Sequence, residues 1–219
     1  ANPRELLALK QSLAALPEIS AQLTLLHSQL LVESFETWDQ AEDLYDLIER
    51  AIRPEAPLSL RDGNIIQEGY APEIDELRKA SKEGKEWIAA LEGRERERTG
   101  IESLKVRYNQ VFGYYIEITK ANLARVPPDY IRKQTLVNAE RFTTAELQEL
   151  EERVIGADVK LLASEQEAFT ALRSRLATET HRLDSMATLL ALVDVLAGLA
   201  EAAALYRYAK PTPTCGAAC

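Results

Sequence analysis

The stretch "LKVRYNQVFGYYIEITKANLARVPPDYIRKQTLVNAERF", residues 104–142, stands out in this chain because it lacks helical periodicity. Its first part alternates the apolar residues Leu104, Val106 and Tyr108 with polar ones, and "YYIEIT" repeats the alternation. Such alternation is typical of half-buried strands. A third extended piece, "KQTLVNAERF", completes a small sheet, and about three strands suffice for a stable module. The stretch therefore predicts a β module.

Helical patterns flank this module on both sides. Upstream, residues 73–100 carry a thin apolar stripe among charges, and at 1.5 Å per residue the helix would be about 40 Å long. Downstream, Thr143 and Glu146 form a candidate capping box, after which apolar residues recur at spacings of three and four as far as Val193. We therefore expect two antiparallel helical arms joined at their tip by the β module.

The first 53 residues predict a small helical core. Pro3 and Pro17 suit the starts of two helices, and Ser34 can cap a third. One face of that third helix is formed by Ala41, Leu44, Leu47, Ile48 and Ala51. The returning helix becomes strongly apolar after Met186, so we expect its last third to be buried against these helices.

These patterns divide the chain into six segments. They are core helices at 1–53, a connecting loop at 54–72, an outgoing helix at 73–100, the β module at 101–142, a returning helix at 143–208 and a tail at 209–219. In the connecting loop, Asp62 and Gly63 suggest a tight turn between two short extended pieces.

Composition restricts the class of protein. Hydrophobic residues make up 46% of the chain, yet the sequence predicts no apolar run near the ~18 residues of a membrane span, and the N-terminus lacks a signal-peptide layout. We therefore expect a cytoplasmic protein with no membrane partner. Cys215 and Cys219 lie in the tail, and His27 and His181 are isolated, so no metal site is predicted.

Charge is distributed unevenly along the acidic chain. Residues 101–142 hold seven cations and four anions, a net charge of +3, so the remaining residues carry −12 of the total of −9. The net-positive region is the predicted tip of the acidic arms. This placement suits contact with phosphates, although cross-strand pairing of Lys105 and Arg107 with Glu117 would explain the same residues structurally.

A long segment of this sequence resembles a known family. "LKVRYNQVFGYYIEITKANLARVPPDYIRKQTLVNAERFTTAELQELEE", preceded by "RERERTGIESL", is similar to the clamp and adjoining lever of the bacterial MutS family of mismatch-repair proteins. The upstream "DGNIIQEGYAPEIDELRKASKEGKEWI" looks like the passage from core to lever, and the resemblance extends over residues 2 to about 208. It implies a mainly α fold, in which core helices and two antiparallel lever helices carry a three- to four-stranded clamp.

The resemblance implies a fragment of a dimeric ATPase. No Phe-x-Glu mismatch-reading motif and no GxxxxGK[ST] phosphate loop is present, so we expect neither mismatch recognition, ATP hydrolysis nor another enzymatic activity from this chain. ATP and magnesium are expected only in the missing domain, and no cofactor in this one. The implied partners are the backbone of duplex DNA, a second MutS subunit and a mismatch-repair matchmaker protein. The implied role is to encircle DNA and to relay the nucleotide state.

Seven residues are candidates for contact with the DNA backbone. By analogy with the family's "RxQTLxNAERY" segment, four of them are Arg132, Lys133, Gln134 and Asn138. Asn109, in the predicted hairpin tip, is a fifth. The family usually has lysine at the position of Val137 and glycine at that of Arg107, so Lys105 and Arg107 are added as compensating cations.

Two other functions fit parts of the sequence. Antiparallel arms with a dimerising or protein-binding tip are one alternative, which an exposed apolar tip face would favour. A nuclease is the other, because Asp129, Asp158 and Lys160 loosely match a carboxylate–lysine pattern. Asp158 lies in a predicted helix, where it is poorly placed to share a metal with Asp129.

Overall fold

The structure is a computed structural model that describes residues 1–25 and 38–209. The chain divides into two compact units. One unit consists of Ala1–Arg4 and Arg50–Ala171, and the other of Glu5–Glu49 and Leu172–Cys219. The fold is mainly α with one small antiparallel sheet, as the sequence predicted. The sheet has four strands, because the piece predicted as a third strand, residues 133–142, contains a turn between two strands.

Three of the described helices precede the connecting segment: α1 (Pro3–Ala14), α2 (Leu16–Leu23) and α4 (Glu42–Ala51). Their starts agree with the expectation from Pro3 and Pro17. The five residues predicted to share one face of the third helix are all buried. Ser34, its predicted cap, and His27 lie outside the described residues.

The segment that connects α4 to the next helix is held by a pairing of its two extended pieces. A bridge between Ile52 and Ile66 pairs its two extended pieces, as the sequence predicted, and both side chains are buried. Between them a single 3-10 turn, Leu60–Asp62, ends at Gly63, whose φ of 65° favours glycine. The segment delivers the chain to the start of α5.

Helix α5 (Pro72–Thr99) places every seventh residue on one buried line. Ile74, Ser81, Ile88 and Glu95 are all buried, and Leu91 lies beside them. A seven-residue repeat of buried positions is typical of a helix that packs along a second helix. Gly100 ends α5 in the left-handed region, at φ 64°.

Helix α6 (Ala145–Thr178) runs antiparallel to α5. Ion pairs join Arg78 to Glu165, Lys85 to Asp158 and Arg94 to Glu146, at 3.0, 3.0 and 2.5 Å.

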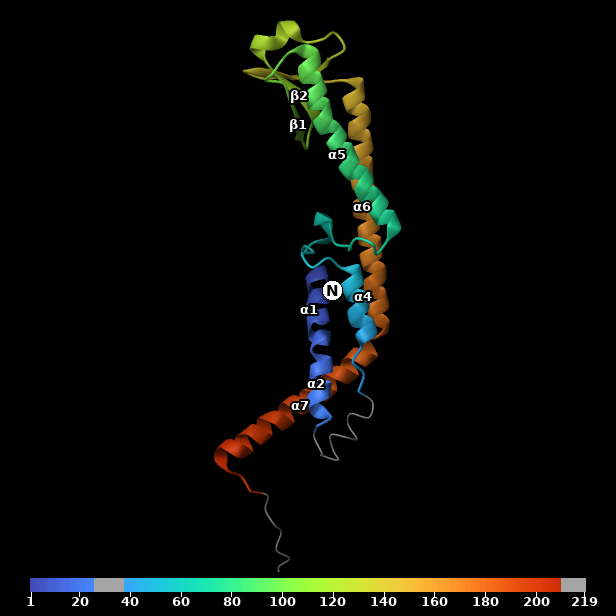
Figure 1. The fold of residues 1–219 in the computed structure, drawn as a ribbon, viewed down its shortest axis with the longest axis vertical. Helices are drawn as coiled ribbons and strands as arrows, with labels where there is room; N and C mark the ends of the chain where they lie inside the picture. Colours follow the sequence, from blue (N-terminus) through green and yellow to red (C-terminus); the bar gives the residue numbers. More distant parts are fainter. Residues whose placement is uncertain (26–37, 210–219) are drawn as a thin grey trace, which may run out of the picture. The chain divides into compact units, whose positions relative to one another are not determined.

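The residue numbers on α6 fall as those on α5 rise, which confirms the predicted outgoing and returning arms. Figure 1 shows the sheet at the end of this helix pair, where α5 ends and α6 begins.

The start of α6 differs from the predicted capping box. Thr144, not Thr143, precedes the helix, and its Oγ1 accepts a hydrogen bond from the N–H of Leu147 at 3.1 Å. Glu146 does not complete the box, because its carboxylate pairs with Arg94 across the helix pair. Glu146 therefore forms an ion pair with a distant residue instead of the local hydrogen bond of a capping box.

The sheet contains β1 (Lys105–Asn109), β2 (Gly113–Thr119), β3 (Ile131–Thr135) and β4 (Ala139–Thr143). All neighbours are antiparallel, in the order β1-β2-β4-β3, and a 3-10 segment, Lys120–Arg125, leads out of β2. The register is irregular between Arg132 and Gln134, which marks a β-bulge at residue 133. The sheet is thus inserted between α5 and α6.

The predicted single returning helix is wrong at residue 179. Glu179 has φ −97° and ψ 8°, and it separates α6 from α7 (Thr180–Tyr206). Just beyond the break, Arg182 donates hydrogen bonds to Asp39 at 2.6 Å and to both oxygens of Asp43 at 2.9 and 3.0 Å. Apolar periodicity alone does not report such a break, because the apolar residues continue on both sides of it.

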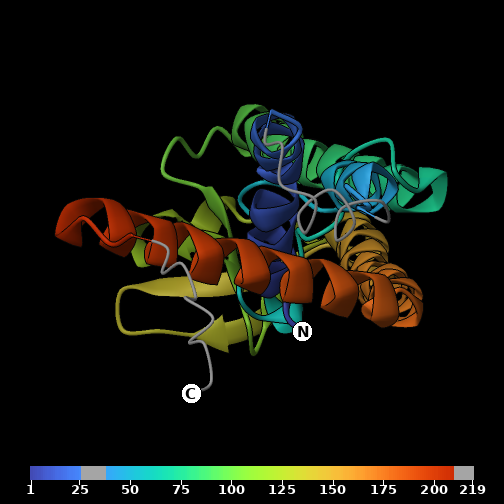
Figure 2. The same cartoon turned by 90° about the horizontal axis from the view of Figure 1, so that it is seen from below.

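Helix α7 does not have the burial that its apolar sequence predicted. Met186 is its buried residue, whereas Val195, Leu199 and Leu205 are exposed. Figure 2 shows it as one uninterrupted helix. By length and composition it is the one helix among the described residues able to cross a membrane, contrary to the expectation from the sequence; one such helix is weak evidence for a span.

Gly84 allows α5 and α6 to approach closely. A Cβ at position 84 would overlap Cγ2 of Val154, a side chain with little freedom to move away. Gly93 and Gly156 have open space instead. Gly84 therefore meets a packing requirement that the other two glycines do not have.

We expect Gly84→Ala to lower the free energy of unfolding by about 1–2 kcal/mol, because overpacking outweighs the better helix propensity of alanine. Gly93→Ala is the matched control and should raise it by about 0.5–1 kcal/mol. Urea unfolding measures both. Equal stabilisation by the two substitutions would contradict the close contact with Val154.

The Arg182 cluster predicts a pH dependence. Hydrogen bonds from Arg182 hold the pKa of both Asp39 and Asp43 below the ordinary 3.8. The contacts of Arg182 with the two carboxylates therefore stabilise the fold fully above pH 3.8, and this stabilisation is lost as the pH falls through the lowered pKa values. We expect Arg182→Leu to lower the free energy of unfolding by about 1 kcal/mol at pH 7. In acid, the variant and the unaltered chain should be equally stable. Thermal unfolding measures this, with Arg173→Leu as the exposed control.

Candidate nucleic-acid interface

The two faces of the sheet have different surroundings. Because side chains alternate along a strand, Val106, Tyr114, Ile116 and Phe142 share one face. These residues pack in a cluster with Ile88 and Leu91 of α5 and Leu147 and Val154 of α6. The opposite face is not part of this cluster, so its residues are the ones available to a ligand.

The face of the sheet opposite the helices, here called the outer face, carries three cations around one carboxylate. Arg107 and Arg141 pair with Glu117 at 3.8 and 3.7 Å, and Lys105 lies directly opposite Glu117 in the register of β1 and β2. The structural pairing considered from the sequence is therefore present. A single carboxylate does not balance three cations, so this face keeps a positive potential.

Arg141 is the centre of the outer face. Its guanidinium lies 4.2 Å from the centroid of the Tyr115 ring and donates a hydrogen bond to Oε1 of Gln134 at 2.8 Å. Sequence reasoning did not include Arg141 among the candidates. Strand alternation in "NAERF" contains the signal, because it places Arg141 and Glu140 on opposite faces.

Arg132 and Lys133 do not join the outer face. Arg132 reaches Glu140 at 2.8 Å, a buried carboxylate on the helix-facing side. The ammonium of Lys133 donates hydrogen bonds to the carbonyl oxygens of Phe112 and Tyr114, at 3.1 and 3.4 Å. It also lies 3.7 Å from Glu151 of α6, so Lys133 links β3, the β1–β2 hairpin and α6.

Glu151 completes this link from the helix side. Its Oε1 accepts a hydrogen bond from the N–H of Tyr114 at 3.1 Å, and the carboxylate occupies the space that a Cβ on Gly113 would need. Gly113 also has a φ of 68°. Only glycine suits both the conformation and the close approach.

The two candidate asparagines lie in different turns. Asn109 uses its side-chain oxygen to accept hydrogen bonds from the N–H groups of Val111 and Phe112, at 2.8 and 3.4 Å. Asn138 is exposed in the β3–β4 turn, and its backbone oxygen accepts from Lys120. The structure therefore brings Lys105, Arg107 and Gln134 together, and leaves the other four candidates elsewhere on the module.

The two turns of the β module expose apolar residues, but these residues do not form one continuous surface. Val111 and Phe112 lie in the β1–β2 turn, and Val137, which is 84% exposed, lies in the β3–β4 turn. Thr119 pairs with Ala139, so the second turn lies beside the end of β2 that is farther from Gly113. The two turns are thus at opposite ends of the sheet, with the charged face between them.

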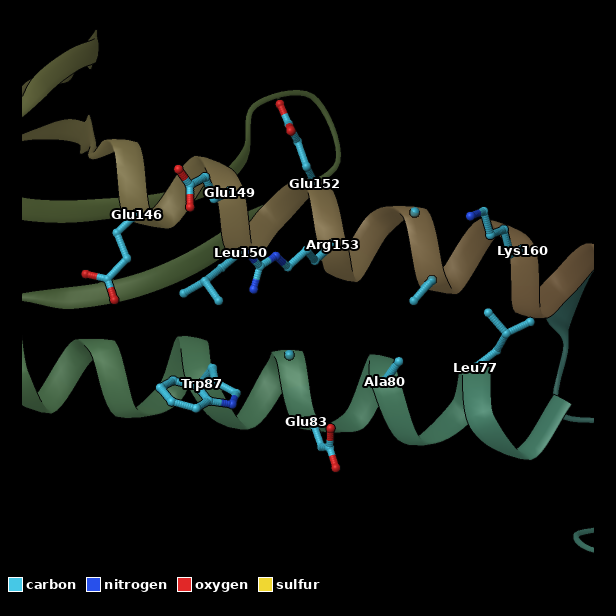
Figure 3. A pocket seen from close by; sticks show the side chains of 13 residues that line it. Leu77, Ala80, Glu83, Trp87, Glu146, Glu149, Leu150, Glu152, Arg153 and Lys160 are labelled. Atoms are coloured by element: carbon cyan, nitrogen blue, oxygen red, sulfur yellow. The ribbon is translucent and has the colours of Figure 1, made fainter. Parts of the chain in front are cut away.

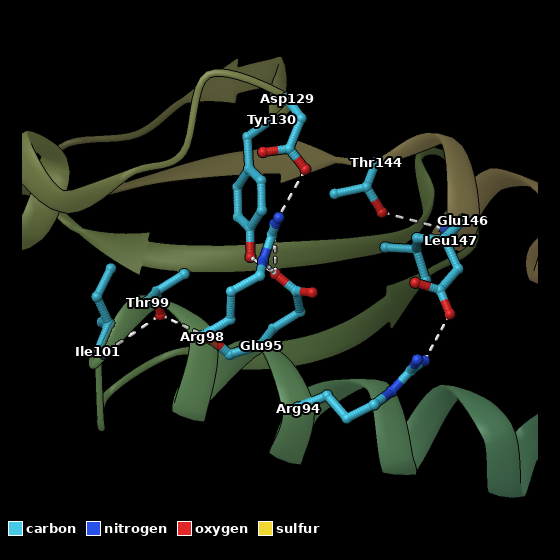
Figure 4. Close-up of polar contacts among 10 residues, drawn as sticks. All are labelled: Arg94, Glu95, Arg98, Thr99, Ile101, Asp129, Tyr130, Thr144, Glu146 and Leu147. Carbon is cyan, nitrogen blue, oxygen red and sulfur yellow. Dashed lines mark hydrogen bonds and ion pairs between the residues drawn. The ribbon is translucent and has the colours of Figure 1, made fainter.

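A buried polar cluster attaches the loop before β3 to α5 (Figure 4). The hydroxyl of Tyr130 donates a hydrogen bond to Oε2 of Glu95 at 2.6 Å, and Arg98 bridges Glu95 to Asp129. Burial, and then the neighbouring Glu95, raises the pKa of the Tyr130 hydroxyl, while Arg98 lowers the pKa of Asp129. The cluster keeps a carboxylate buried with its charge compensated.

The geometry does not support the nuclease pattern. Asp129 is bound by Arg98, whereas Asp158 is bound by Lys85 and Ser81. Thirteen residues of α5 separate Lys85 from Arg98, which is about 20 Å of helix. Within the described part of the chain, no group of three or more metal-binding side chains is present.

Comparison with known proteins identifies the family. Residues 69–159, which include the sheet and parts of both long helices, match a family model described as MutS family domain IV. A DNA mismatch repair protein MutS from Symbiobacterium thermophilum is 52% identical over 96% of this chain. The chain belongs to the MutS family.

Other MutS relatives match equally extended parts of the chain. DNA mismatch repair proteins MutS from Alkaliphilus oremlandii and Methanothrix thermoacetophila are 51% and 48% identical, over 97% and 99% of the chain. The chain spans about a quarter of the length of these relatives, 24% and 25%. The resemblance inferred from residues 104–142 is therefore confirmed.

We expect Lys133→Met to loosen the β1–β2 hairpin while the rest of the sheet stays folded, because the hairpin loses the ammonium that joins it to Glu151. Hydrogen exchange of the Tyr114 amide should become about tenfold faster, as for the loss of about 1.4 kcal/mol of local stability. Lys120→Met, an exposed change at the other end of β2, is the control. Unchanged protection in Lys133→Met would disprove the link.

Proposed function

We propose that this chain is the lever and clamp of a mismatch-repair protein, and that the clamp holds duplex DNA through non-specific backbone contacts. The observation that carries the proposal is the outer face of the sheet, where Lys105, Arg107 and Arg141 surround the single carboxylate of Glu117. Cations attract the phosphates of any DNA sequence equally. A few such contacts would hold a duplex without fixing the position of the clamp along it.

The proposed role is mechanical and not catalytic. The antiparallel pair of α5 and α6 is joined to the sheet by the Lys133–Glu151 and Tyr130–Glu95 contacts, which suit a lever that moves the clamp as one body. We propose that ATP and magnesium act elsewhere in the intact protein, and that the lever relays the nucleotide state. A second MutS subunit and a matchmaker protein are the further proposed partners.

We also propose that α7 is covered by protein and not by lipid. Its exposed apolar residues suit either environment. The relatives that match 96–99% of this chain are named DNA mismatch repair proteins, which supports a cytoplasmic protein whose longer chain supplies that cover.

Salt-dependent DNA binding tests the proposed clamp. We expect weak binding of the 219-residue chain to matched and mismatched duplexes alike. Replacing Lys105 and Arg107 by glutamine should reduce the slope of log K against log salt by about 2, or about 0.9 per lost phosphate contact. Fluorescence anisotropy of a labelled duplex measures both affinity and slope.

The matched control removes the same charge from the lever. Lys79 and Lys82 are exposed on α5 and form only i,i+4 pairs, so the Lys79→Gln/Lys82→Gln variant should leave the slope unchanged. Equal losses in the two variants would show that net charge, and not the outer face, governs binding. An Arg132→Ala/Lys133→Ala variant tests the residues suggested by the family segment. Self-association without DNA binding would favour the alternative of a dimerising tip.

A further inference from the structure

A groove of about 660 Å³ runs between α5 and α6, away from the outer face of the sheet (Figure 3). Its lining combines alanine, glycine and leucine residues with an equal number of charged residues and one aromatic residue, Trp87. The lining residues on α5 are Leu77, Ala80, Glu83, Gly84 and Trp87. Those on α6 are Glu146, Glu149, Leu150, Glu152, Arg153, Gly156, Ala157 and Lys160.

Trp87 is the unusual residue of this groove. It is 59% exposed, although the indole ring is among the largest apolar side chains. Tryptophan is enriched among the residues that contribute most to protein interfaces, and the face of its ring attracts lysine and arginine cations. An exposed indole beside a groove therefore suits a ligand that carries both apolar surface and positive charge.

Carboxylates gather at the Trp87 end of the groove. Glu83 lies one turn before Trp87 on α5, and the antiparallel contacts of Gly84 with Val154 and of Arg94 with Glu146 place Glu149 and Glu152 across from it. Figure 3 shows the carboxylates of Glu83 and Glu152 on opposite sides of the helix pair, each pointing away from the space between the helices.

Two of these carboxylates are available to a partner. Glu83 pairs with Lys79 and Glu146 with Arg94, but within residues 1–25 and 38–209 neither Glu149 nor Glu152 forms an ion pair. Glu149 and Glu152 are both exposed. They are placed to pair with cations of a segment lying over Trp87, at low cost in desolvation.

We propose that this groove docks a basic, amphipathic peptide segment of a partner protein. Apolar side chains of the segment would lie on Leu150 and, about 10 Å along the groove, on Ala80. One lysine or arginine would lie over Trp87, and others would pair with Glu149 and Glu152. DNA does not suit the site, because carboxylates around the indole repel phosphates. Arg153 and Lys160 are cations within the lining itself, and each would repel a basic segment.

Binding of a fluorescein-labelled lysine–leucine amphipathic peptide to the 219-residue chain tests the proposal. We expect anisotropy to report saturable binding at low salt, and much weaker binding of the counterpart with glutamate in place of lysine. Trp87→Ala should weaken the affinity about tenfold, and Glu149→Gln/Glu152→Gln by a similar factor. Arg153→Gln, which removes one repelling cation, should strengthen it several-fold.

The matched control separates the groove from the overall negative charge. Glu97→Gln/Glu167→Gln removes two exposed carboxylates, one from each helix, that do not line the groove. This variant should bind the peptide as the unaltered chain does. Equal weakening by the two double variants would overturn the proposal and show non-specific attraction.

Intrinsic fluorescence locates the peptide independently. An unlabelled peptide should shift the emission of the unaltered chain, and the shift should be absent in Trp87→Phe, which leaves Trp38 as the remaining tryptophan. A shift that persists in Trp87→Phe would place binding elsewhere. A concentration-dependent dimer that Trp87→Ala abolishes, with no peptide binding, would assign the groove to a second copy of this chain and overturn the proposal.

Discussion

The antiparallel packing of α5 on α6 is the constraint on which the sheet depends. The sheet is one insertion between these helices, so β1 begins where α5 ends and β4 ends where α6 begins. Residues of both helices cover its inner face, and without them Ile116 and Phe142 would be exposed to water. The close approach at Gly84 and the three ion pairs along the helices therefore also position the clamp.

The same arrangement places the cations of the sheet beside different carboxylates. Lys133 and Arg132 point toward carboxylates on the helix side, where Glu151 and Glu140 use their charge within the fold. Lys105, Arg107 and Arg141 lie on the opposite face around one carboxylate. The net charge of residues 101–142 does not distinguish these cations. In the folded sheet, they lie on different faces and pair with different carboxylates.

Much of the fold was predictable from residues 104–142 and the helices beside them. Alternation in "LKVRYN" and "YYIEIT" correctly placed two strands. The apolar stripe of α5 and the spacing of three and four in α6 correctly predicted helices on both sides of the sheet. The break at Glu179 was missed, and Glu146 was wrongly placed in a capping box, because Arg182 and Glu146 each contact residues distant in sequence. Of the seven candidate contact residues, the sheet brings together three.

The sequence by itself determined the family, the antiparallel arms and the β module, because periodicity and a long characteristic segment are properties of neighbouring residues. Tertiary structure decided which cations point toward carboxylates on the helix side of the sheet. Strand register, the bulge at residue 133 and the partner carboxylates of α6 set those directions. Such contacts join residues far apart in the chain, and the energy of an ion pair depends on a geometry that no local pattern encodes.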